Sequence, residues 1–304
     1  MDPGRRRHYG AFYDGPPRGP LAVVWGNCQA EALRVALAPG LPLTTVRVPP
    51  VHELTAADLP HVARLLARTR LVLSQPVRAD YRDLPIGTAQ LRAHLPADAR
   101  TVMWPVIRYR GLHPWTAIVR HPSDPAAVPP VVPYHDLRTL GAAAGRSLGR
   151  PAAGAFRAVA ERSVAELARR ERACDVGVSD VLRPLGLDAV HVLNHPANPV
   201  LLALAGRVRA HLGLRGEVAD PGRELLGGIR APLDPQVLDA LGLDPDRARP
   251  HWLVHGTPVT EDDVRAPQLR WYADHPAWVP AGLERYAADL EVLGSSCASP
   301  LGGR

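Results

Sequence analysis

Cys28 is the residue whose type and setting point most directly to chemistry in this sequence. It stands in the polar turn GNCQ, between an apolar run at 21–25 and a run of strong helix formers at 30–37. The N–H groups and dipole of a helix that begins at this turn would stabilise a thiolate, so we expect the pKa of the Cys28 thiol to fall. With Asn27 and Gln29, the same N–H groups suit an oxyanion or the positioning of the thiol. The alternative is a buried, inert cysteine.

His195 is the candidate base for this thiol. It lies in a second polar turn, NHP, between a predicted strand at 188–193 and a predicted helix at 199–212. If the strands before the two turns belong to one parallel sheet, their carboxyl ends share an edge and Cys28 and His195 can meet. Imidazole accepts a thiol proton and protonates a leaving group near neutral pH. Asn194 would then help to hold the oxyanion or position His195, whereas a turn histidine bonded to backbone is the alternative.

Further polar residues follow two other predicted strands. Ser74 and Gln75 end the run at 71–76, where they line an oxyanion pocket or cap the next helix. Because the chain has no lysine, phosphates must be met by arginine or backbone N–H groups. The candidates for binding donor or substrate near these strand ends are Arg78, Arg82, Arg108, Arg110 and His113. Structural ion pairs are the alternative for the arginines.

The elements that must position these residues alternate between strand and helix. Apolar runs predict strands at 21–25, 41–51, 71–76 and 99–114. Helical spacing predicts helices at 30–37, after an N-cap at Thr55, and at 156–172, 199–212 and 278–293. This alternation is typical of an α/β fold with a doubly wound parallel sheet flanked by helices, whose site lies at the carboxyl ends of the strands.

The domain organisation is predicted from shifts in composition along the chain. Residues 1–19 indicate a disordered arm, and 20–212 an α/β catalytic core with a Pro/Gly-rich insertion near 120–152. Residues 213–293 indicate a mainly helical extension, and 294–304 a flexible tail.

Composition narrows the class of protein. The 304 residues are 46% hydrophobic and 22% charged, which is typical of a globular protein, and no apolar run approaches the ~20 residues of a membrane span. Three cysteines fit neither a disulfide framework nor a zinc site, so we expect a reducing cytoplasm and no metal. The net charge is +6, but scattered arginines and 5% aromatic residues argue against nucleic-acid binding.

The two turn motifs resemble the first and last conserved blocks of SGNH (GDSL-type) hydrolases. The SGNH pattern has Gly-Asp-Ser at the nucleophile, where this chain has Gly26-Asn27-Cys28. It also has an aspartate three residues before the histidine, where this chain has Val192. These departures speak against a standard serine esterase.

The chain is more closely similar to the WcbI-type polysaccharide biosynthesis family, proposed acetyltransferases that bind coenzyme A. The resemblance covers about residues 20–290 and rests on GNCQA at 26–30, SQPVRADYRDLPIGT at 74–88, WPVIRYRGLHP at 104–114 and NHPANPVL at 194–201. It implies an SGNH-like α/β core with added helices, a cysteine–histidine site, an acyl-CoA donor and a role in making a glycan such as a capsule.

We therefore expect an acyltransferase in which His195 activates Cys28. The thiol would take an acetyl or longer acyl group from coenzyme A or an acyl carrier protein and pass it to a glycan or another small hydroxyl or amine acceptor. Direct transfer within a ternary complex stays open. The alternatives are a thiol-dependent SGNH-like esterase or deacylase, and a non-catalytic glycan- or nucleotide-binding protein.

Overall fold

The computed structural model describes residues 3–121, 123–124, 127–149 and 151–294, and the chain divides into two compact units. Unit 1 comprises Met1–Ile107, Leu167–Ala189 and Pro196–Leu226, and unit 2 comprises Arg108–Glu166, Val190–His195 and Gly227–Arg304. This division differs from the predicted boundary after residue 212, because apolar residues between 115 and 159 share a core with others between 237 and 293. The predicted tail lies, except for Gly294, outside the described residues.

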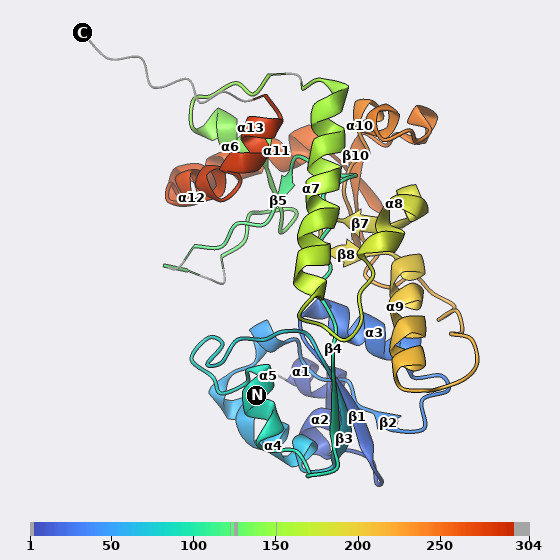
Figure 1. Cartoon of the computed structure of the whole chain (residues 1–304). Coiled ribbons are helices and arrows are strands. Elements are labelled where there is room, and N and C mark those ends of the chain that lie inside the picture. Colours follow the sequence, from blue (N-terminus) through green and yellow to red (C-terminus); the bar gives the residue numbers. More distant parts are fainter. Residues whose placement is uncertain (1–2, 122, 125–126, 150, 295–304) are drawn as a thin grey trace. The chain divides into compact units, whose positions relative to one another are not determined.

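Unit 1 is built on the predicted parallel sheet, in the strand order β2-β1-β3-β4 (Figure 1). The strands are β1 (Leu21–Trp25), β2 (Thr44–Thr45), β3 (Thr69–Ser74) and β4 (Arg100–Met103). All five residues of β1 are buried, which explains why its sequence is a continuous apolar run. At the carboxyl edge Trp25 pairs with Ser74, and Ser74 pairs with Met103. The polar residues that follow β1 and β3 therefore begin at neighbouring points of one edge.

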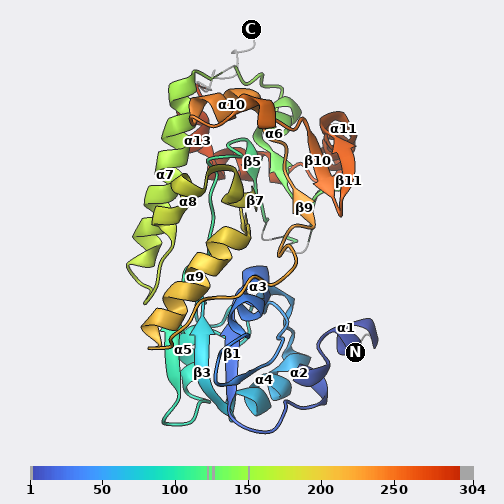
Figure 2. The ribbon, with the colours of Figure 1, turned by 90° about the vertical axis from the view of Figure 1, so that its right-hand side faces the viewer.

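Unit 1 also contains several helices. The bounds are α3 (Cys28–Leu37), α4 (Leu59–Leu66), α5 (Thr88–Arg92), α8 (Leu182–Leu185) and α9 (Asn198–His211), with short 3-10 turns at Val51–Glu53, Ala56–Asp58, Ser179–Val181 and Gly186–Asp188. The predicted cap at Thr55 is confirmed by its capping box with Asp58. Helix α3 packs on α9, where Ala32 contacts Leu201 in a small apolar cluster (Figure 2).

The predicted disordered arm is wrong for the residues that the structure describes. Helices α1 (Pro3–His8) and α2 (Gly10–Asp14) form there, and the side chains of Phe12 and Tyr13 are buried in the core of unit 1. The Tyr13 hydroxyl donates a hydrogen bond to Asp58 (2.9 Å), and the Arg5 guanidinium lies 3.4 Å from the same carboxylate. These contacts anchor the segment, because a buried carboxylate needs such donors.

Unit 2 contains helices together with short antiparallel strands, and within the predicted extension at 213–293 helices predominate. Helix α7 (Ala153–Glu171) contributes residues to both units. Strands β9 (Ile229–Arg230), β10 (His251–Val254) and β11 (Thr257–Thr260) form an antiparallel sheet, and β5 (Thr116–Ala117) pairs with β6 (His135–Asp136). The other helices are α6 (Leu137–Ala143), α10 (Pro235–Ala240), α11 (Glu261–Asp274), α12 (Trp278–Arg285) and α13 (Ala287–Val292), with a 3-10 turn at Pro245–Arg247. The predicted helix at 278–293 is thus interrupted at Tyr286.

The strand predicted at 188–193 exists but does not extend the parallel sheet of unit 1. Strand β7 (Val190–Val192) pairs with β8 (His195–Pro196) in a two-stranded sheet of its own. The chain reverses at once, and the His191 carbonyl accepts a hydrogen bond from Ala231 N (2.9 Å) instead. The prediction that the strands before Cys28 and His195 share the edge of one parallel sheet is therefore wrong.

No helix in the described part of the chain has both the length and the apolar character that crossing a membrane requires.

A buried histidine predicts how stability depends on pH. His135 is fully buried with its Nδ1 2.6 Å from the Tyr272 hydroxyl, and burial lowers its pKa from 6.5 to about 4. The unfolded chain therefore binds more protons between these values, and the free energy of unfolding falls as the pH falls through that window. We expect the drop from pH 7 to pH 5 to be about 1–2 kcal/mol smaller in His135→Gln than in the parent.

Urea unfolding at both pH values measures this difference, and His211→Gln, at an exposed position, is the matched control. A His135→Gln protein with the same pH dependence as the parent would contradict the prediction.

Candidate functional site

Cys28 is the first residue of α3, directly after the end of β1. Asn27 is the N-cap, and its side chain accepts a hydrogen bond from Gln29 N (2.9 Å). Cys28 itself is half-buried rather than enclosed in the core. The helix therefore begins two residues before the predicted range of 30–37, with the thiol in its first turn, where the dipole favours an anion.

Two buried side-chain amides hold this turn in place. Gln75 directly follows β3, and its Oε1 accepts a hydrogen bond from Asn27 N (2.8 Å) while its Nε2 donates to Gln29 Oε1 (3.0 Å). Gln29 continues the chain of contacts, because its Nε2 donates to Ile107 O (2.7 Å) and its Oε1 accepts from Ile107 N (3.0 Å). Both glutamines are almost fully buried, at 0% and 1% exposure. The glutamines were predicted either to hold an oxyanion or to position the site, and these bonds favour positioning.

The turn is packed so closely that position 26 has no room for a side chain. A Cβ at Gly26 would collide with the amide of Gln75. Ser74, the last residue of β3, is also fully buried, and its hydroxyl donates to Gln75 O (2.8 Å) and lies 3.0 Å from the Thr88 hydroxyl. The polar atoms of Ser74 thus support the strand end.

The loop after β3 carries two of the predicted donor-binding arginines. Asp80, Arg82 and Asp83 all have positive φ angles between 50° and 63°, which costs energy for residues with side chains. The loop is pinned at Gly87, where a Cβ would come within 2.6 Å of the Ala79 Cα. Arg82 is exposed and donates a hydrogen bond to the His52 carbonyl.

Arg78 lies in the same loop and is the better-placed cation for a ligand. It is exposed and, among the described residues, forms no hydrogen bond or ion pair. It belongs to unit 1, as do Cys28 and the two glutamines. An exposed guanidinium that forms no ion pair among the described residues suits a phosphate, which it binds through paired charge-assisted hydrogen bonds.

His195 lies in unit 2, at the start of β8, among aromatic and polar groups. The Tyr134 hydroxyl donates to Asn194 Oδ1 (2.9 Å) and lies 3.4 Å from His195 Nε2. The rings of Tyr134 and Trp252 are stacked, with their centroids 6.1 Å apart. Sequence reasoning missed Tyr134, because it lies in a proline-rich segment without regular spacing, 61 residues before the histidine.

The remaining predicted residues lie in unit 2 with different surroundings. Arg110 is buried, pairs with Asp289, donates to the Pro114 carbonyl and lies 4.7 Å above the Tyr286 ring. This network favours the structural role that the sequence left open for Arg110. Arg108 is half-buried.

His113 is buried with its Nδ1 3.0 Å from Pro232 O, and burial lowers its pKa to about 4. It is therefore neutral at pH 7. It lines a cavity of about 190 Å³ in unit 2.

The structure thus groups the predicted residues into two sets. Cys28, Asn27, Gln29, Ser74 and Gln75 form one connected group in unit 1, in the unit that also holds Arg78 and Arg82. Asn194 and His195 form a second group with Tyr134 in unit 2. The pairing of Cys28 with His195 remains a prediction. The described residues contain no cluster of three or more His, Cys, Asp or Glu that could hold a metal ion.

Comparisons with known proteins agree on one family. The family described as "Polysaccharide biosynthesis enzyme WcbI" matches residues 21–217. A solved structure of WcbI has the same fold, with a TM-score of 0.75 at 20% identity, over 91% of this chain and 98% of that one. That structure is described as the native protein of a novel polysaccharide biosynthesis enzyme, without a disulfide bond between coenzyme A and one of its cysteines. No curated protein matches the sequence significantly.

The glutamine network predicts a large cost for losing one amide. Gln75→Leu leaves Asn27 N without its acceptor and removes one of the two hydrogen bonds that Gln29 Oε1 accepts, and we expect the free energy of unfolding to fall by about 2–4 kcal/mol. Gln236→Leu, at an exposed position, should change it by less than about 0.5 kcal/mol. Urea unfolding of both variants measures the difference. Equal losses in the free energy of unfolding would contradict a stabilising role for the Gln75 amide.

The setting of Cys28 predicts selective alkylation. Burial and the neighbouring Glu171 and Asp175 raise the pKa of Cys174 to about 11, whereas Cys28 lies at a helix N-terminus. Because the thiolate is the reactive form, iodoacetamide at pH 7 should modify Cys28 at least about tenfold faster than Cys174. Peptide mass spectrometry follows both sites, with Cys297, outside the described residues, as a reference thiol. A Cys28 pH–rate profile like that of Cys297 would exclude an activated thiol.

Proposed function

The chain belongs to the WcbI family of polysaccharide biosynthesis enzymes, and from that premise we propose that it is an acyltransferase. It moves an acyl group, most simply acetyl, from coenzyme A to a hydroxyl or amine of a glycan. The observation that carries the proposal is the placement of Cys28 in the first turn of α3, fixed by the Asn27 cap and the Gln29–Gln75 amides. A thiol held in this way suits attack on a thioester.

In the proposed reaction the Cys28 thiolate attacks the acyl carbonyl carbon of the donor. A new bond forms between Cys28 Sγ and that carbon, the carbon–sulfur bond to coenzyme A breaks, and the leaving thiolate takes a proton from His195. The acceptor hydroxyl then attacks the Cys28 thioester while His195 removes its proton, and the Cys28 thiolate leaves. The dipole at the N-terminus of α3 favours the negative charge on each oxyanion. The proposal requires His195 to reach the reacting groups.

Unit 1 offers arginine side chains that suit the phosphates of coenzyme A. Arg78 is the first candidate, because it is exposed and has no partner among the described residues. Arg82 lies four positions on in the same pinned loop. We extend the proposal to an SGNH-like arrangement of the sheet and to a reducing cytoplasm, in which the thiol stays available.

Radiolabelled acetyl-CoA tests the proposal directly. We expect label on Cys28 in the parent protein, none in Cys28→Ser, and unchanged labelling in Cys174→Ser as the matched control. His195→Gln should slow labelling by about 10²–10⁴-fold if the imidazole is the base. Arg78→Ala should weaken coenzyme A binding about tenfold in calorimetry, with Arg285→Ala, at an exposed position of α12, as the control.

The other outcomes identify other functions. Release of acetate in the absence of any acceptor, at a rate matching that of labelling, would make the protein a thiol esterase. Neither label nor binding of coenzyme A would contradict the proposal and favour a binding protein without acyl chemistry.

A further inference from the structure

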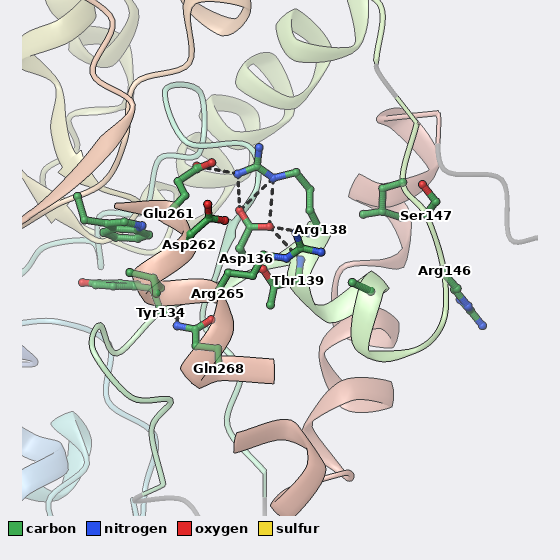
Figure 3. A pocket seen from close by; sticks show the side chains of 14 residues that line it. Tyr134, Asp136, Arg138, Thr139, Arg146, Ser147, Glu261, Asp262, Arg265 and Gln268 are labelled. Atoms are coloured by element: carbon green, nitrogen blue, oxygen red, sulfur yellow. Dashed lines mark hydrogen bonds and ion pairs between the residues drawn. The ribbon is translucent and has the colours of Figure 1, made fainter. Parts of the chain in front are cut away.

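Unit 2 contains a cavity of about 440 Å³ that no step of the proposed reaction has used. It lies between residues of α6 and α11, with Tyr134 and Trp252 on its wall (Figure 3). We refer to it as the α6–α11 cavity. Its volume falls in the range of roughly 300–1,000 Å³ that is typical of small-molecule sites.

The charges of the α6–α11 cavity do not favour an anion. Three carboxylates and three guanidinium groups line it, belonging to Asp136, Glu261, Asp262, Arg138, Arg146 and Arg265. In Figure 3 the guanidinium of Arg146 points away from the other labelled groups. A site for a phosphate needs an excess of positive charge, which this wall lacks. An uncharged, polar ligand fits better.

One ion-paired arginine forms a rigid part of the wall. Arg138 Nη2 lies 2.8 Å from Asp136 Oδ2 and 3.0 Å from Glu261 Oε1. Asp136 is fixed in turn as the N-cap of α6, where it accepts hydrogen bonds from Arg138 N and Thr139 N. The same three residues line the neighbouring cavity of about 190 Å³. The bridge therefore offers planar, preorganised polar groups to a ligand on either side.

Gln268 gives a second, independent sign of a ligand. Its side chain is 1% exposed and lines the cavity, and its Nε2 donates to Tyr134 O (2.9 Å). Its Oε1 is buried and has no hydrogen-bond partner among the described residues. Such an acceptor is costly unless a donor arrives, and a hydroxyl group is a donor that an uncharged ligand can supply. Trp252 adds an apolar face beside it.

The cavity is linked to the candidate base within unit 2. Tyr134 lines it and stacks on Trp252, while its hydroxyl donates to Asn194 and lies 3.4 Å from His195 Nε2. A ligand against this wall therefore lies one side chain away from the imidazole.

We propose that the α6–α11 cavity binds the acyl acceptor as an uncharged sugar. Its hydroxyl groups donate to Gln268 Oε1 and to the carboxylates of Glu261 and Asp262, and its ring lies against Trp252. The inference rests on the acyl transfer proposed above, which supplies the need for an acceptor. It names the substrate class as a neutral saccharide rather than a sugar phosphate or an acidic sugar.

Ligand-observed NMR at millimolar concentration tests this with matched probes. The neutral probes are the methyl glycosides of glucose, galactose, mannose and N-acetylglucosamine, and the anionic ones are glucose 6-phosphate and glucuronate. We expect at least one neutral glycoside to bind and the anionic probes to bind at least about fivefold more weakly. Gln268→Leu and Glu261→Gln should weaken that binding about five- to tenfold. Glu284→Gln, an exposed carboxylate on α12 away from the cavity lining, should leave it within about twofold.

Glu261→Gln keeps the test informative if Gln268→Leu fails to fold, because Glu261 is exposed. Preference for the anionic probes, binding by no neutral glycoside, or equal binding by parent and both variants would overturn the proposal. The same titration in Cys28→Ser, which lacks the proposed nucleophilic thiol, should give unchanged binding. Failure of acetyl labelling with retained glycoside binding would therefore refute the acyl transfer alone, and the reverse result would refute the sugar site alone.

Discussion

Two buried amides facing each other between strand ends are the constraint on which the geometry of unit 1 depends. Gln75 bonds the backbone at Asn27, and Gln29 bonds both polar groups of Ile107. The contacts therefore tie together the chain after β1, after β3 and after β4. The Nε2 group of Gln75 has its acceptor only while Gln29 stays in register, and buried polar groups without partners are costly. The position of the Cys28 backbone follows from this pairing.

Unit 2 relies on a different kind of polar contact. Arg138 and Arg110 are each held by carboxylates from distant parts of the chain, Glu261 and Asp289. These arginines join α6 to α11, and the loop after residue 107 to α13. The lack of lysine is consistent with this use, because a planar guanidinium makes several directed hydrogen bonds at once.

The sequence allowed the parallel sheet and α3 to be predicted, because both have strong local signals. Leu21–Trp25 is a continuous apolar run, and Thr55 has the acidic partner of a capping box three residues on. The helices of the arm were missed, because Phe12 and Tyr13 are isolated among Arg, Gly and Pro, and only burial against distant residues orders them. The strand at β7 was assigned to the wrong sheet, because a short buried run such as Val-His-Val looks the same in a hairpin and in a parallel strand.

The site was predictable in part for the same physical reason. Asn27, Cys28 and Gln75 follow strands of one sheet, and the order of elements places them at one edge. Arg110 also follows a strand, but its carboxylate partner is 179 residues away and carries no local signal. Tyr134 and the α6–α11 cavity depend on contacts between α6, α11 and β10, none of which the spacing of residues within a segment reveals.

The interleaving of the two units has a consequence for how the chain is made. Unit 1 takes its segments from 1–107, 167–189 and 196–226, so ribosomes finish its sheet long before they synthesise α9, the helix that packs on α3. Leu201 is added only after the unit 2 segments 108–166 and 190–195 have been synthesised. Until then the apolar face of α3 around Ala32 is not covered by this residue. Folding therefore cannot proceed one unit after the other along the nascent chain, and no single cut divides the protein into two intact units.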